Sequence, residues 1–99
     1  MNIQKLMRQA QEMQERLQSE MSEMRVEGGS GGGMVAVVMD GHKNLLSLAL
    51  DPEIVTKDDI GMLQDLIVAA VHDAASKVDA ELGRKLGGLG AGLKIPGMG

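Results

Sequence analysis

The stretch that decides the fold is residues 25–52, which read RVEGGSGGGMVAVVMDGHKNLLSLALDP. It contains two apolar runs of strand length, Met34–Met39 and Leu45–Leu50, separated by polar residues that begin with Asp-Gly. Asp-Gly between such runs is typical of a hairpin, because glycine accepts the positive φ that a tight turn needs. A further strand is expected to open at Val26, so the stretch predicts a three-stranded antiparallel meander.

Both faces of this predicted sheet are apolar. An antiparallel sheet with one face in water normally alternates apolar and polar residues, whereas both alternating sets of Met34–Met39 are apolar. The two candidate helices could both cover one face, so we expect the other face to meet a second copy of the chain. The candidate dimer-interface residues are Met34, Val35, Ala36, Val37, Val38, Leu46, Leu48 and Leu50.

A long amphipathic helix is predicted before the sheet and another after it. Residues 2–24 contain no Gly or Pro and place apolar residues at steps of three and four. At 1.5 Å per residue this helix is about 35 Å long, so its N-terminal half should project past the short strands. After a capped turn at Asp51–Glu53, Thr56 is expected to cap the second helix, with Asp59 in the capping-box position.

The chain is expected to form one domain, residues 1–86, followed by a flexible glycine-rich tail, residues 87–99. A chain of 99 residues buries a modest core, so burial shared in a dimer would add stability. The glycine-rich run at residues 28–33 is predicted to be a hairpin connection and not a phosphate loop. No Lys-Ser or Lys-Thr pair follows it, and it leads into a strand instead of a helix.

Composition argues against several classes of function. Because the chain has no cysteine, it offers no disulfide and no thiolate metal site. Because it has no Phe, Tyr or Trp, it lacks the stacking platforms of many single-strand nucleic-acid modules. His42 and His72 have no second histidine at ligand spacing, and no serine has a convincing partnered base. We therefore expect no enzyme activity, no metal, no cofactor and no small-molecule substrate.

The lengths of the apolar runs indicate where in the cell the protein is expected. The N-terminus lacks the apolar core of a signal peptide, and no run approaches the roughly 20 apolar residues of a membrane span. We expect a soluble, cytoplasmic protein with no membrane partner.

Charge is distributed unevenly along the chain. The net charge is −4, and residues 51–82 carry eight acidic and two basic residues. Beyond Leu82 there are three basic residues and no acidic one. An acidic balance opposes nonspecific binding to polyanions, so any such contact must use local basic clusters.

A set of residues in a fixed order extends over nearly the whole chain. Its members are Leu6, Met7, Gln9, Ala10, Gln11, Met13, Gln14, the run Gly31–Val37, Gly41, Leu50, Asp51, Pro52, Leu63, Asp65, Leu66, Ile67, Ala69, Ala70, Asp73 and Ala74. This ordered set resembles the YbaB/EbfC family of bacterial nucleoid-associated proteins. His72 departs from the family pattern, which commonly has Asn there, and methionine is unusually abundant.

The resemblance implies a fold and a function. The fold class is α+β, in the order αβββα, assembled as an intertwined homodimer with projecting helical arms like tweezers. The arms would grip duplex DNA in the bacterial nucleoid, and the family implies no catalysis or cofactor. The dimer with projecting helices also follows from the burial pattern, whereas DNA binding comes mainly from the resemblance.

Basic residues suggest where DNA would make contact. If the two long helices pack antiparallel, residues 1–8 lie beside residues 82–86, and their cations gather at one arm tip. Contacts from such a tip to phosphates would position the duplex without reading its sequence, so we expect low specificity and steep salt dependence. The candidate DNA-binding residues, with Arg16 and Lys94 as the weaker members, are Lys5, Arg8, Arg16, Arg84, Lys85 and Lys94.

An alternative function is a protein–protein adaptor. The Met-rich stripe of the first helix would then bind a partner helix, and the acidic second helix would repel DNA. A gel shift on duplex DNA at near-physiological salt separates the two functions.

Overall fold

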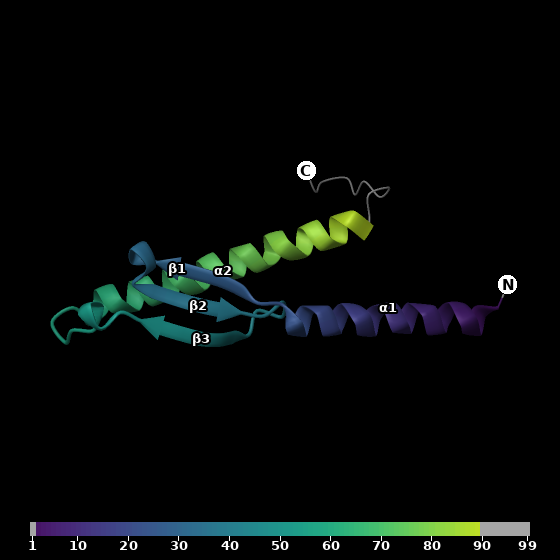
Figure 1. The fold of residues 1–99 in the computed structure, drawn as a ribbon, viewed down its shortest axis with the longest axis horizontal. Helices are drawn as coiled ribbons and strands as arrows, with labels where there is room; N and C mark the ends of the chain where they lie inside the picture. The colour runs from purple at the N-terminus through teal and green to yellow at the C-terminus, as the bar shows by residue number, and fades with distance from the viewer. Residues whose placement is uncertain (1, 90–99) are drawn as a thin grey trace.

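A computed structural model describes residues 2–89 and has the predicted order of one helix, three strands and one helix (Figure 1). Short 3₁₀ turns, η1 and η2, precede β2 and follow β3. The second helix continues beyond the expected domain end at residue 86, and the rest of the predicted tail, residues 90–99, lies outside the described residues. The elements are α1 (Ile3–Glu23), β1 (Val26–Ser30), η1 (Gly31–Gly33), β2 (Val35–Met39), β3 (Leu45–Leu50), η2 (Pro52–Ile54) and α2 (Ile60–Leu89).

The three strands form an antiparallel sheet in the order β1-β2-β3, which confirms the predicted meander. Val37 at the centre of β2 pairs with Gly28 of β1 and with Leu48 of β3. A register shift at Val38–Met39 pairs Met39 with Leu45 and Val38 with Ser47, so Leu46 is an extra residue in β3. This irregularity re-aims the start of β3, as bulges commonly do.

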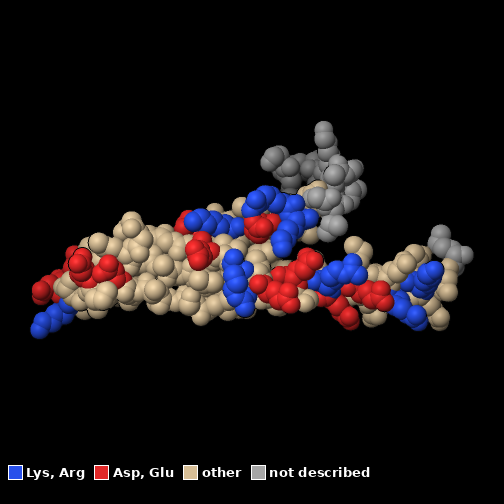
Figure 2. All heavy atoms as spheres, viewed as in Figure 1, with Lys and Arg blue, Asp and Glu red and all other residues tan. Residues whose placement is uncertain are grey.

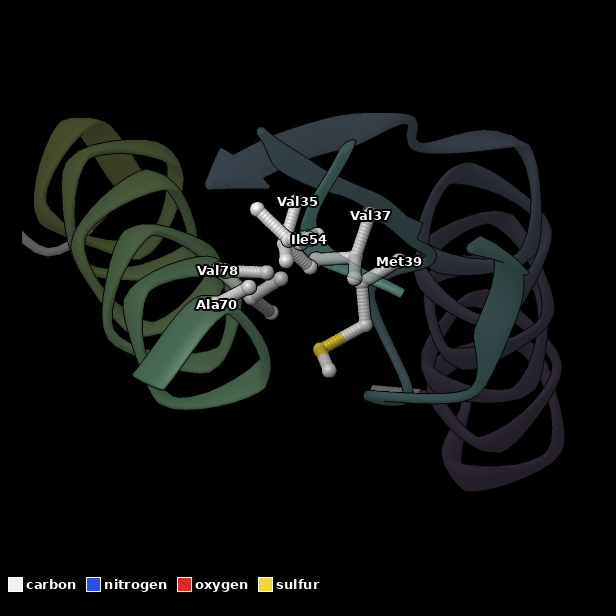
Figure 3. Close-up of a cluster of buried hydrophobic side chains, with 7 residues drawn as sticks. Val35, Val37, Met39, Ile54, Ala70 and Val78 are labelled. Atoms are coloured by element: carbon white, nitrogen blue, oxygen red, sulfur yellow. The ribbon is translucent and has the colours of Figure 1, made fainter. Parts of the chain in front are cut away.

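The core lies between the sheet and α2, which packs across β1 and β2 (Figures 1 and 3). Val35 and Val37 are 0% and 1% exposed beneath this helix. Their expected place in a dimer interface is therefore wrong: helix and sheet of one chain already bury them. The core cluster consists of Val35, Val37, Met39, Ile54, Ala70, Ala74 and Val78.

α2 crosses β1 very closely, and Gly28 makes this possible. A Cβ atom at Gly28 would lie 2.5 Å from the backbone nitrogen of Ala74 and 2.7 Å from its Cα. The next residue, Gly29, donates its N–H to Asp73 Oδ2 at 3.0 Å, and the Ser30 hydroxyl donates to the carbonyl of Leu66. Gly28 and Gly29 are thus strand residues that contact α2. The connection to β2 is Gly31–Met34, in which the three glycines have positive φ.

The contact between Asp73 and β1 makes stability depend on pH. The N–H of Gly29, and secondarily Lys77, hold the pKa of Asp73 below its ordinary value of 3.8. A lowered folded-state pKa contributes stability above the unfolded value, and this contribution is lost as the pH falls through the folded value.

We expect Asp73→Ala to lose less stability than the wild type when the pH falls from about 6 to about 3. Urea unfolding midpoints measured across this range test the expectation. Parallel losses in the two proteins would contradict it.

Capping residues delimit the elements between β3 and α2. Asp51 accepts the N–H of Glu53 at 2.9 Å, as predicted. The cap of α2 is Asp59, whose Oδ1 accepts the N–H of Met62 at 3.1 Å. Thr56, predicted to be this cap, instead accepts the N–H of Asp58 in a turn just before the helix. The predicted capping box lies one turn too early because both residues are good N-caps.

α1 projects from the sheet, as predicted (Figure 1). It begins after Asn2, whose side chain accepts the N–H of Lys5, and none of its residues is buried. The molecule is elongated as a result, with dimensions of 68 × 27 × 16 Å. Among residues 2–89, no helix is both long and apolar enough to cross a membrane.

Candidate nucleic-acid interface

An open cleft lies between the base of α1 and the C-terminal half of α2. Its inner part is a hollow of about 440 Å³ lined by Met24, Arg25, Val26, Glu27, Lys77, Ala80, Glu81 and Arg84. Its outer part is a hollow of about 450 Å³ lined by Met13, Arg16, Leu17, Glu20, Lys85 and Leu86. We call these two hollows together the α1–α2 cleft. Cations from both helices therefore face one open space.

The expected arm tip is wrong in its geometry. α2 first packs across the sheet, so its last described turns reach only the middle of α1. Lys85 and Arg16 line the same hollow, and about 16 Å of helix separates Arg16 from Lys5, given a rise of 1.5 Å per residue. Lys5 and Arg8 stand farther out along the arm, and Arg16 becomes a central candidate.

Several basic side chains near the cleft already have partners. Arg84 pairs with Glu81, and Lys77 pairs with Asp73 at 2.9 Å. Arg25 donates to the backbone carbonyls of Ser22 and Met24 at 2.9 and 2.8 Å. The two ion pairs neutralise part of the positive charge of α2, which makes Arg84 a weaker candidate than expected.

Four predicted cations remain exposed and form no ion pair within the described part of the chain. We call them the unpaired cations: Lys5, Arg8, Arg16 and Lys85. Figure 2 shows Lys and Arg at separate places along α1 and gathered on the C-terminal half of α2, with Asp and Glu between them. The positive charge is therefore divided among separate sites on the two helices. Lys94 lies outside the described residues.

A second exposed feature is the apolar surface around β3. Leu45, Leu46 and Leu48 are 46%, 45% and 43% exposed, because α2 covers β1 and β2 but not this edge strand. Sequence reasoning missed Leu45, since nothing in the sequence marks the register shift beside it. Of the other predicted interface residues, Met34 and Ala36 are exposed, and Val38 and Leu50 are half-buried.

No metal-binding group is found within residues 2–89: no three His, Asp or Glu side chains there come together in a suitable cluster.

Comparison with known proteins gives matches over nearly the whole chain. The YbaB/EbfC DNA-binding family matches residues 1–93. A nucleoid-associated protein of Acetivibrio thermocellus is 47% identical, covering 98% of this chain and 89% of its own. A second, from Caldanaerobacter subterraneus subsp. tengcongensis, is 41% identical, covering 98% of this chain and 90% of its own.

A solved structure that resembles this chain has the same fold. The crystal structure of an uncharacterized protein from Helicobacter pylori superposes with a TM-score of 0.75, covering 90% of this chain and 97% of its own. Its sequence is 21% identical, so this likeness concerns the fold alone.

Proposed function

The chain belongs to the YbaB/EbfC DNA-binding family, and on that premise we propose that it binds duplex DNA as a homodimer, through phosphates and with low sequence specificity. The observation that supports this most directly is the set of unpaired cations, which line the arm and the α1–α2 cleft. Lys and Arg contacts to phosphate carry most nucleic-acid affinity and position the protein without reading bases. The proposed location is the nucleoid.

The proposed dimer uses the β3 edge. An edge strand presents unpaired backbone groups that a second chain can satisfy, and the three exposed leucines of β3 lie on that strand. A second copy would bury them and double the number of unpaired cations on one particle. Two sets of phosphate contacts on one particle bind DNA more tightly than either set alone. This gain offsets the repulsion between DNA and the net charge of −4 on each chain.

We expect a graded loss of dimer when Leu48 is replaced. Leu48→Ala removes apolar contact area and should weaken association, and Leu48→Asp places a charge in the buried interface and should leave monomers. Sedimentation velocity over a range of protein concentrations measures both, with circular dichroism to show that each variant is folded. Folded variants that sediment as the wild type does would exclude this strand from the interface.

The test of the proposed function is a titration of the wild type into labelled duplexes of several unrelated sequences at two salt concentrations. We expect a Kd of about 10⁻⁶–10⁻⁴ M or tighter near physiological salt, similar among sequences, and weaker as salt rises. Absence of binding at the upper end of that range, or an affinity unaffected by salt, would refute the proposal.

A further inference from the structure

The β2–β3 loop, Asp40–Asn44, packs against the last turn of α1. The N–H of Gly41 donates to the carbonyl of Met21 at 2.8 Å, and a Cβ at Gly41 would lie 2.8 Å from both the Cα and the carbonyl oxygen of Met21. His42 Nε2 and Ser22 Oγ lie 3.2 Å apart, within hydrogen-bonding distance. Gly41 does not have a positive φ. Glycine is therefore required here because α1 lies too close for a side chain, and not because of the backbone conformation.

The same loop also holds α2. Lys43, in the left-handed region with a φ of 64°, pairs through Nζ with Asp79 Oδ1 at 2.8 Å. The loop itself is fixed by Asp40, which is 6% exposed and accepts hydrogen bonds from the N–H groups of His42 and Asn44 and from the Asn44 side-chain amide. One short, internally bonded loop is thus tied to both cation-bearing helices.

α1 has little else to fix its direction, since none of its residues is buried and it packs sparsely against other elements of the described chain. We infer that the β2–β3 loop sets the angle between α1 and α2, and that Gly41 and Lys43 are positioning residues for the cations on the two helices. The effect of this positioning on DNA binding rests on the proposed function. The geometry itself concerns the protein alone.

Distance measurement between the helices tests the inference without DNA. The chain has no cysteine, so Gln9→Cys and Ser76→Cys place one spin label on each helix, at exposed positions. Dilution with unlabelled protein restricts the signal to distances within one chain. We expect a narrow distribution in the wild type and a shifted or broadened one in Gly41→Ala. Gly61→Ala is the matched control, because its Cβ meets nothing within 4 Å.

A second pair of variants covers the case in which Gly41→Ala does not fold. Lys43→Gln removes the ion pair with Asp79 of α2, and we expect it to broaden the distance distribution. Lys43→Arg keeps the positive charge, so its distribution should be as narrow as that of the wild type. If Gly41→Ala and Lys43→Gln both keep the wild-type distribution, the loop does not position the helices. If Gly41→Ala is unfolded, Lys43→Gln alone decides.

DNA affinity supplies the functional readout. Gly41→Ala changes no charge, yet we expect its Kd to rise about tenfold, because contacts held at a fixed separation bind more tightly than unaligned ones. An unchanged Kd alongside an altered distance distribution would overturn the positioning role. If the wild type itself does not bind DNA, the proposed function fails, while the distance measurements still decide whether the loop sets the angle.

Discussion

A variant that neutralises all four unpaired cations is expected to bind duplex DNA about 10²- to 10³-fold more weakly than the wild type near 0.1 M salt. Each cation that meets a phosphate releases condensed counterions, so the slope of log K against log salt should shrink by about 0.9 for every phosphate that the variant no longer neutralises. The replacements lie at exposed positions, so the fold should persist. They are Lys5→Gln, Arg8→Gln, Arg16→Gln and Lys85→Gln.

Fluorescence anisotropy of a labelled duplex, at four or more salt concentrations, measures both quantities. Single replacements then show how much of the affinity comes from the outer arm and how much from the cleft. Lys57→Gln serves as their matched control. Lys57 lies in the loop between η2 and α2, at the end of the molecule away from α1 (Figure 1). If the fourfold variant keeps the wild-type affinity and salt slope, the unpaired cations are not the DNA contact.

Gly28→Ala is expected to destabilise the fold by about 3 kcal/mol, as overpacking against a rigid neighbour does. The added methyl would lie 2.5 Å from the backbone nitrogen of Ala74, so helix and sheet must separate. Such a separation would open the core around Val37 and stretch the hydrogen bond from Gly29 to Asp73. For a domain of this size the corresponding fall in Tm is about 15 °C.

Thermal unfolding at one fixed protein concentration is the measurement, because association makes Tm depend on concentration. Gly61→Ala is again the matched control: it adds the same methyl to α2, where nothing lies within 4 Å. We expect it to be neutral or slightly stabilising, since alanine favours helix over glycine. A Gly28→Ala protein with the wild-type Tm would show that the close approach of α2 to β1 is not required.

Local chemistry made much of the fold predictable. The apolar runs and the Asp-Gly turn indicated the strands, and the three- and four-residue steps indicated both helices. The role of Gly28 was not predictable in this way. Glycines in β1 and in the connection look alike in sequence, and only the long-range crossing by α2 distinguishes them. Ala74 was a partial signal, because a small helix residue permits another backbone to approach.

The candidate site was less predictable, because it depends on the angle between α1 and α2, which no sequence pattern specifies. The sequence indicates that α1 and α2 are long and basic near Lys5 and Lys85, but not how far α2 lies over the sheet before it reaches α1. Because of that packing, Lys85 lines the same hollow as Arg16 and not the one expected around Lys5. Likewise, the two-sided apolar strand indicated burial, but not that α2 of the same chain covers Val35 and Val37.

The family and the named relatives bear on what the surfaces are for. They support a nucleoid-associated DNA-binding protein, and they give no support to the alternative of a protein–protein adaptor. On this basis we propose that a second copy of the chain covers the exposed leucines of β3, and that DNA contacts the unpaired cations.

The central claim is that two chains joined at the β3 edge present their arms together. The most direct test is the mass of the wild type in solution, measured by light scattering on a size-exclusion column at micromolar concentration. Our account predicts a particle of twice the 10.5 kDa chain mass. A stable, folded particle of 10.5 kDa would contradict it.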